Sequence, residues 1–177
     1  MTDIADCYFT SLTDPTAFFA KRLDAATWTA ATAANQTIAL QMATAKIDSL
    51  EYSGYKLLST QTRAFPRKYS PTDSVNPWGN LLSEDSWGYI YDSDDVPQVV
   101  LDACCLEALK LLEYYSSTSV ASKKRQDLID QGVKSYSIGK LSESYGPGAT
   151  GISTNGLRSR EAYDLLALYI NRRGDIR

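Results

Sequence analysis

Histidine is absent from all 177 residues of the chain. Without an imidazole there is no Ser-His-Asp or Cys-His catalysis and no usual proton shuttle near neutral pH. Most zinc sites also use histidine, so a zinc site is not expected. We therefore predict a protein that is not an enzyme, with no catalytic residues, no cofactor and no bound metal.

Long apolar runs, a disulfide framework and an excess of positive charge are missing as well. No run approaches the roughly 18 apolar residues of a transmembrane helix, and the first residues lack the layout of a signal peptide. The three cysteines include an adjacent pair, Cys104 and Cys105, inside an apolar helical pattern typical of small core residues in a reducing cytoplasm. The 18 Lys and Arg against 21 Asp and Glu give a net charge of -3, unlike a dedicated DNA-wrapping domain.

Helical patterns dominate the first two thirds of the chain. Asp14-Pro15 fits the start of a helix, and residues 25–34 predict a short helix or turn. A longer helix is expected from Asn35 to a point before Gly54. Its apolar face repeats at spacings of three and four and consists of Leu40, Ala43, Ile47 and Leu50.

The strongest helical pattern begins after Val96-Pro97 and runs for some 20 residues, or about 30 Å. Its predicted buried face consists of Leu101, Cys104, Ala108, Leu111 and Tyr115. Its predicted polar face consists of Asp102, Glu107, Lys110 and Glu113. We expect this to be the central core helix.

The remainder of the chain changes character. Residues 132–145 predict a β-hairpin with a glycine turn, and residues 146–157 form a flexible Gly/Ser/Thr/Pro linker. Ser159 caps a last helix with a separate apolar stripe. The expected fold is mainly α: a small helical bundle within residues 1–145, with a protruding β-hairpin at 132–145 and a C-terminal docking helix and tail at 158–177.

Two patterns of known chemistry occur in unsuitable contexts, and a third is not singled out by the sequence. Residues 146–151 fit G-x-G-x-x-G, but a linker follows them instead of the helix that a dinucleotide site needs. A calcium loop starting at Asp92 would need Gly and Glu where Pro97 and Ala103 stand. Carboxylates before a helix are more simply capping groups. No pair of carboxylates is singled out for hydrolysis of a glycoside.

A basic cluster and an aromatic group could each bind DNA, and each also has a simpler structural interpretation. Lys123, Lys124 and Arg125 could meet DNA phosphates, or could form a solvated face or lie near a helix end. An aromatic group around Trp78 and Trp87 could stack on bases. Since its charged neighbours are acidic, protein contact or local packing is the better interpretation.

Four segments, in order, resemble the head–tail connector family of tailed bacteriophages, also called adaptor or head-completion proteins. Its members are sometimes labelled DnaT-like single-stranded DNA-binding. The first two segments are YFTSL at residues 8–12 with AFFAKRL at 17–23 and Trp28, and ALQMATAKID at 39–48. The third is QTRAFPR at 61–67, followed by VPQVVLDA at 96–103 and EAL at 107–109. The fourth is GVKS at 132–135 with IGKL at 138–141 and Tyr145.

This resemblance implies a virion protein made in the host cytoplasm and located at the head–tail neck. It implies a homo-oligomeric ring of twelve copies below the portal protein, in contact with a tail, stopper or neck protein. Double-stranded DNA would pass non-specifically through the ring lumen, where Lys123, Lys124 and Arg125 are the candidate contacts.

Two sets of candidate partner-binding residues follow. For the portal they are Glu161, Leu165, Leu166, Tyr169, Arg172 and Arg173, although the last helix could instead pack on its own core. For the neighbouring subunit or the tail they are Val133, Tyr136, Ile138, Leu141, Tyr145, Trp78 and Trp87.

Two other functions compete with the adaptor. A replication protein that binds single-stranded DNA would show affinity that falls steeply with salt. A small hydrolase would need a polar pocket that contains carboxylates of perturbed pKa.

Overall fold

The structure is a computed structural model that describes residues 6–52, 54–68, 96–117, 123–124, 128, 135–138, 141–144 and 156–170. The helices in these ranges include α1 (Thr13–Phe19), α2 (Ala26–Ala30), α3 (Ala33–Asp48), α5 (Gln98–Ser116) and α7 (Arg160–Leu166). The prediction of a mainly α-helical chain is confirmed. No helix in the described ranges is both long and apolar enough to cross a lipid bilayer.

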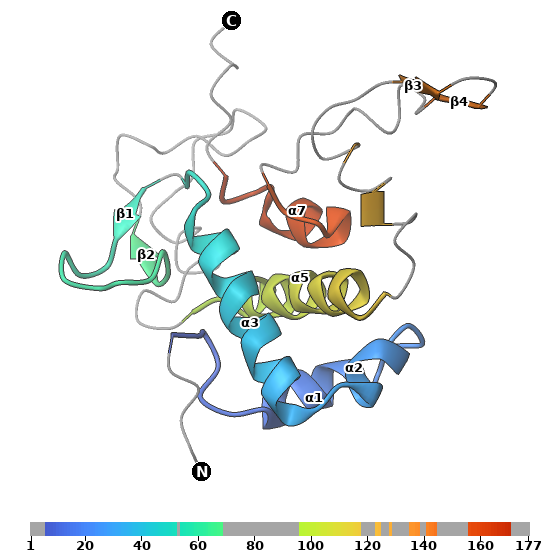
Figure 1. Cartoon of the computed structure of the whole chain (residues 1–177). Coiled ribbons are helices and arrows are strands. Elements are labelled where there is room, and N and C mark those ends of the chain that lie inside the picture. The colour runs from blue at the N-terminus through green and yellow to red at the C-terminus, as the bar shows by residue number, and fades with distance from the viewer. Residues whose placement is uncertain are drawn as a thin grey trace, which may run out of the picture.

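Helix α5 is the centre of the fold. Figure 1 shows α3 crossing it, α7 along one side, and α1 and α2 on the other, and all four helices contact it. Because α5 is covered on several sides, its middle is buried almost all the way round; its buried residues are Val100, Ala103, Cys104, Cys105, Leu106, Glu107, Ala108, Leu109, Leu111 and Leu112.

This central position corrects two predictions about α5. Glu107 was placed on a polar face but is fully buried. Tyr115 was placed on the buried face but is 59% exposed, because it lies in the last turn, near the C-terminal end of α5. A helix packed on several sides has no continuous polar face, so periodicity alone misassigns residues of this kind.

The helix starts follow local hydrogen bonding. Helix α3 begins at Ala33, earlier than the predicted Asn35, because the Thr32 hydroxyl accepts from the backbone N–H of Asn35 (3.3 Å) and caps the helix. Ser159 caps α7 as predicted, accepting from the backbone N–H of Ala162 at 3.1 Å.

Aromatic side chains join distant segments in the core. The Phe65 ring packs edge-on against Tyr8, Tyr52 and Tyr169, with ring centroids 6.5, 4.8 and 5.6 Å away. Such edge-to-face pairs stabilise a core beyond the area that they bury. Phe65 therefore holds together the N-terminal segment, the chain after α3 and the turn after α7.

Two short antiparallel strand pairs accompany the helices. β1 (Tyr55–Lys56) pairs with β2 (Arg67–Lys68), and β3 (Ser135–Ile138) pairs with β4 (Leu141–Ser144). In the second pair Ser135 lies opposite Ser144. The protrusion of this hairpin, and its role in binding, stay predictions.

Candidate functional site

The C-terminal helix lies against the core of its own chain. Leu166 is fully buried, Tyr169 is buried and Leu165 is half-buried. Glu161 accepts from Arg22 at 3.0 Å, which links α7 to the turn after α1. Most of the apolar stripe predicted to bind a portal is therefore used in internal packing, which is the alternative arrangement considered for this helix.

A buried carboxylate fixes the chain just before α7. Glu107 of α5 accepts from Lys46 Nζ of α3 at 2.9 Å, from the backbone N–H of Arg158 at 2.8 and 3.0 Å, and from that of Ser159 at 2.8 Å. The same Lys46 ammonium donates to the carbonyl of Gly156 at 3.0 Å. We call this set the Glu107 junction. The junction fixes the position of the Arg158 backbone, and therefore the point from which the Arg158 side chain extends.

Arg158 and two tyrosines form an aromatic and cationic group at the C-terminal end of α5. The Arg158 guanidinium lies 3.7 Å from the Tyr114 ring centroid, within the range of a cation–π contact. The Tyr115 ring meets Tyr114 edge-on at 5.0 Å. Tyr114 is half-buried, whereas Tyr115 is open to solvent.

Lys123 and Lys124 complete this group, which we call the α5-end cluster: Tyr114, Tyr115, Lys123, Lys124 and Arg158. Lys123 Nζ lies 5.9 Å from the Tyr114 ring and donates to the Tyr115 carbonyl at 3.3 Å. A cation at this position also interacts favourably with the negative end of the helix dipole. Lys124 is exposed. The cluster therefore combines three cations with aromatic faces.

Sequence reasoning found only part of this cluster. It singled out Lys123 and Lys124, but it placed Tyr115 in the core and did not consider Tyr114 or Arg158. The adjacent tyrosines at the end of an apolar helix were a usable signal, since a tyrosine suits places where the ring is partly buried and the hydroxyl stays wet. Arg158 lies over 40 residues further along, and no local pattern links it to Tyr114.

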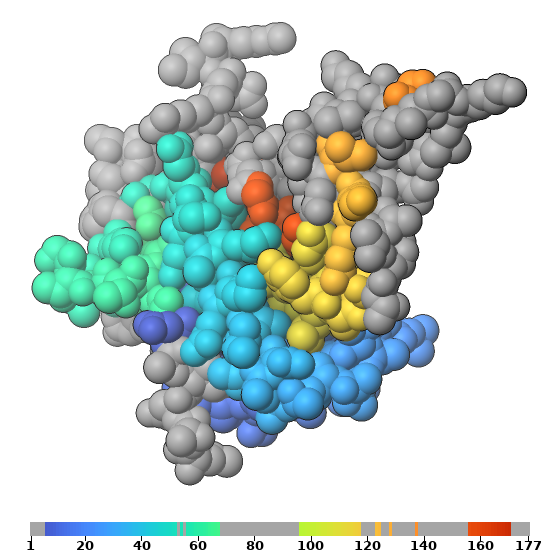
Figure 2. All heavy atoms as spheres, viewed as in Figure 1, coloured from blue at the N-terminus to red at the C-terminus, as the bar shows by residue number. Residues whose placement is uncertain are grey.

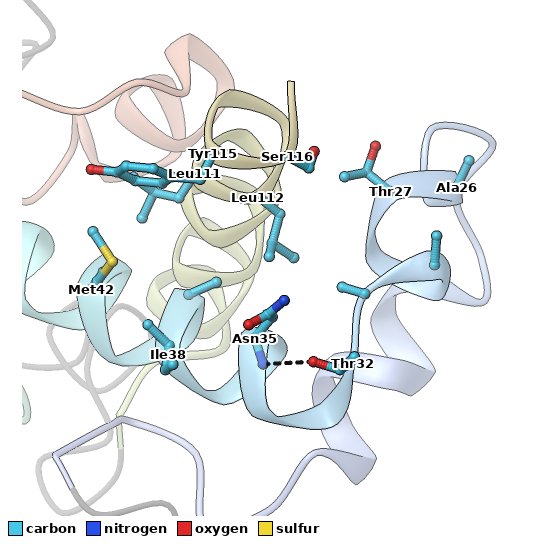
Figure 3. A pocket seen from close by; sticks show the side chains of 13 residues that line it. Ala26, Thr27, Thr32, Asn35, Ile38, Met42, Leu111, Leu112, Tyr115 and Ser116 are labelled. Atoms are coloured by element: carbon cyan, nitrogen blue, oxygen red, sulfur yellow. Dashed lines mark hydrogen bonds between the residues drawn. The ribbon is translucent and has the colours of Figure 1, made fainter. Parts of the chain in front are cut away.

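An open groove adjoins the cluster. It has a volume of about 860 Å³ and lies between α2, α3 and the C-terminal half of α5. Figure 2 shows this end of α5 (yellow) at the surface beside α3 (cyan). In Figure 3, Tyr115 and Leu112 of α5 stand above Met42, Ile38 and Asn35 of α3. Because Tyr115 belongs to both, cluster and groove form one continuous surface.

A pair of thiols meets on the other side of α3. The Thr44 hydroxyl lies 3.5 Å from Cys7 Sγ and 3.4 Å from Cys104 Sγ. Hydrogen bonds from Cys104 and from Thr44 lower the pKa of the Cys7 thiol to about 6. The described residues include no group of three or more His, Cys, Asp or Glu side chains that could hold a metal ion.

Other predicted binding residues are not placed in full. Backbone alone is described for Tyr136, Ile138 and Leu141. Outside the described residues lie Val133, Tyr145, Trp78, Trp87, Arg125, Arg172 and Arg173.

The chain was compared with protein families, curated proteins and solved structures. A family model described as "Putative DnaT-like ssDNA binding protein" matches residues 4–176, nearly the whole chain. No curated protein and no solved structure matches the chain.

Proposed function

The chain belongs to the family of DnaT-like ssDNA binding proteins, and we propose that it binds single-stranded DNA through the α5-end cluster. The family match is the observation that carries this proposal. The proposed role is binding, without catalysis.

The composition of the cluster supports it. Proteins that bind single strands without sequence preference combine cations along the backbone with aromatic faces on which bases stack. Tyr115 offers an exposed ring of this kind. Lys123 donates to the backbone carbonyl of Tyr115, and the next residue, Lys124, is exposed. Arg158, held over Tyr114, adds a third positive charge.

The experiment is a titration of a fluorescent oligo-dT by fluorescence anisotropy over a range of salt concentrations. We expect replacement of both Lys123 and Lys124 by Ala to weaken binding at low salt. It should also reduce the slope of log affinity against log salt by roughly 0.7 for each phosphate that is no longer neutralised. Tyr115→Ala should cost about 1–3 kcal/mol of binding free energy, mainly because a base can no longer stack on the ring.

Lys21→Ala is the matched control, because Lys21 is exposed on the turn after α1 and is not a member of the cluster. It removes the same charge and should leave affinity and salt slope close to those of the wild type. Equal effects of Lys21→Ala and the cluster variants, or no binding of oligo-dT by the wild type, would contradict the proposal.

A second candidate is the ring-forming adaptor between phage head and tail. Beside the resemblance of the segments between residues 8 and 145, large apolar side chains are exposed on three separate segments, at Leu23, Leu58 and Leu168. A head-to-tail ring needs two different contact regions on each subunit, and these leucines are candidates for them.

Light scattering and electron microscopy of the chain mixed with its portal protein test the adaptor. The adaptor predicts added density on the portal and little affinity for free DNA, and Leu23→Glu or Leu58→Glu should remove that density. An unchanged portal outline, with the chain left free, would reject it.

A further inference from the structure

We propose that the groove beside Tyr115 is a nucleobase site, in which bases of a single strand leave the stack and insert between α2, α3 and α5. Phosphates of the same strand would lie along Lys123 and Lys124. This inference rests on the proposed function and names the part of the ligand that the surface takes up.

The lining of the groove suits an uncharged, flat ligand. It contains no charged side chain and is made of Ala26, Thr27, Ala30, Ala31, Thr32, Asn35, Ile38, Ala39, Met42, Leu111, Leu112, Tyr115 and Ser116. A charged phosphate would lose hydration against these largely apolar walls without gaining a cationic partner. An aromatic base has no net charge and buries apolar faces.

The size of the groove also fits. Its volume of about 860 Å³ lies within the roughly 300–1,000 Å³ typical of small-molecule sites. That space is larger than one base needs, so two adjacent bases are the expected occupancy.

Stacking partners and polar groups occur where a base would need them. The ring of Tyr115 stands at the rim, and the thioether of Met42 lies below it in Figure 3. Sulfur and ring faces both make favourable contacts with aromatic systems. Asn35 points its amide into the groove, while Thr27 and Ser116 face each other across its far end. An amide can donate to and accept from the edge of a base.

A cation lies at the Tyr115 end of the groove. Lys123 Nζ donates to the carbonyl of Tyr115, the residue that also lines the groove. Lys123 therefore lies next to the edge of the uncharged lining. A strand with an anionic backbone and uncharged bases has the same division, and this complementarity favours a nucleotide strand over an apolar peptide helix as the occupant.

The test fills the groove without changing charge. Ala30 is exposed at the end of α2 and lines the groove, so Ala30→Phe should occupy the space and leave the fold intact. Ala17→Phe, at an exposed position of α1, is the matched control. We expect Ala30→Phe to weaken oligo-dT binding roughly five- to hundredfold with an unchanged salt slope, and Ala17→Phe to have no effect.

An oligonucleotide that contains a run of abasic sites is the second change, so that protein and ligand are altered singly and together in a double-mutant cycle. If bases enter the groove, the wild type should bind the abasic strand about as weakly as Ala30→Phe binds oligo-dT. The two changes together should then cost no more than either alone. Photocrosslinking of a 4-thiothymidine oligonucleotide should label peptides that contain Met42 or Tyr115.

The other outcomes separate the two proposals. If Ala30→Phe and the abasic strand leave affinity unchanged while the lysine variants weaken it, the nucleobase site is rejected and single-strand binding stands. If Ala30→Phe instead alters only self-association or capture of a protein partner, the groove is a protein interface and the inference is rejected. If the wild type binds no single strand, both proposals fail.

Discussion

The fully buried carboxylate of Glu107 accepts from the Lys46 ammonium at 2.9 Å, although the Lys46 side chain itself stays 30% exposed. One charge of the pair is thus inside the core and the other is at its boundary. The backbone N–H groups of Arg158 and Ser159 supply the remaining donors. The pair is therefore part of a hydrogen-bonded network that joins α3, α5 and the chain before α7.

Removal of the Glu107 carboxylate should strongly destabilise the fold. Glu107→Ala should lower the free energy of unfolding by about 3–5 kcal/mol, because it leaves the Lys46 ammonium without its carboxylate and buried backbone donors without partners. Glu107→Gln keeps one acceptor oxygen and should cost less. Urea denaturation measures both. The control, Glu113→Gln, removes only an exposed pair with Lys110 and should cost under about 0.5 kcal/mol. Equal losses for Glu107→Ala and Glu113→Gln would refute the network.

The Cys7 thiol should make stability depend on pH. Its pKa is lowered from 9.0 to about 6 in the folded chain. A lowered pKa contributes stability that is complete above pH 9 and is lost as the pH falls towards 6. Between these values the free energy of unfolding of the wild type should rise with pH more steeply than that of Cys7→Ser.

Alkylation with iodoacetamide offers a second measurement on Cys7. Its rate should be half-maximal near pH 6, since the thiolate is the nucleophile. Cys105 provides the internal comparison: it is buried, and burial raises its pKa well above the usual range. Modification of Cys105 as fast as Cys7 in the folded chain would contradict this assignment.

Replacement of Gly156 should destabilise the fold only because of the backbone conformation at this position. The φ of Gly156 is +93°, and apart from its chain neighbours no atom of the described residues lies within 4 Å of the position that a Cβ would take. Gly156→Ala should therefore cost about 1–2 kcal/mol through the left-handed conformation, with no steric clash. Gly156→Asn should cost less, because Asn tolerates this region. Thermal unfolding of both variants checks the order, and an Asn variant less stable than the Ala variant would count against it.

The N-terminal caps of α7 and α3 should contribute different amounts to the free energy of unfolding. Ser159 is buried and accepts from Ala162, whereas Thr32 caps α3 at an exposed position. Ser159→Ala should cost about 1–2 kcal/mol, because a buried N–H loses its partner. Thr32→Ala should cost less, since water replaces the hydroxyl. Denaturant titration decides, and a greater loss for Thr32→Ala would show that burial does not set the value of a cap here.

Periodicity in the sequence correctly predicted the helices that build the core. The pattern from Val96 onward predicted a helix of some 20 residues, and α5 has 19. It also predicted burial of Cys104 and Cys105, which the structure confirms. These predictions work because repeated apolar residues on a helix need a buried surface, whatever surrounds them.

What failed depends on contacts between distant segments. A glutamate is almost always a surface residue, so Glu107 was predicted to be exposed. Its place between Leu106 and Ala108, in the middle of an apolar run, was the one local clue. The groove and the α5-end cluster combine α2, α3, α5 and Arg158. No spacing along the chain encodes that combination.

The central position of α5 also bears on how the chain folds during synthesis. When a ribosome has released the chain up to residue 117, α3 and α5 can pair, but Glu107 still lacks the backbone donors of residues 158 and 159. The side of α5 that α7 covers stays exposed to solvent until residue 170 has emerged from the ribosome. From the release of residue 117 until residue 170 has emerged, a nascent chain therefore carries an incompletely packed core whose buried carboxylate lacks part of its donors. It becomes a cooperative folding unit only when the last helix docks.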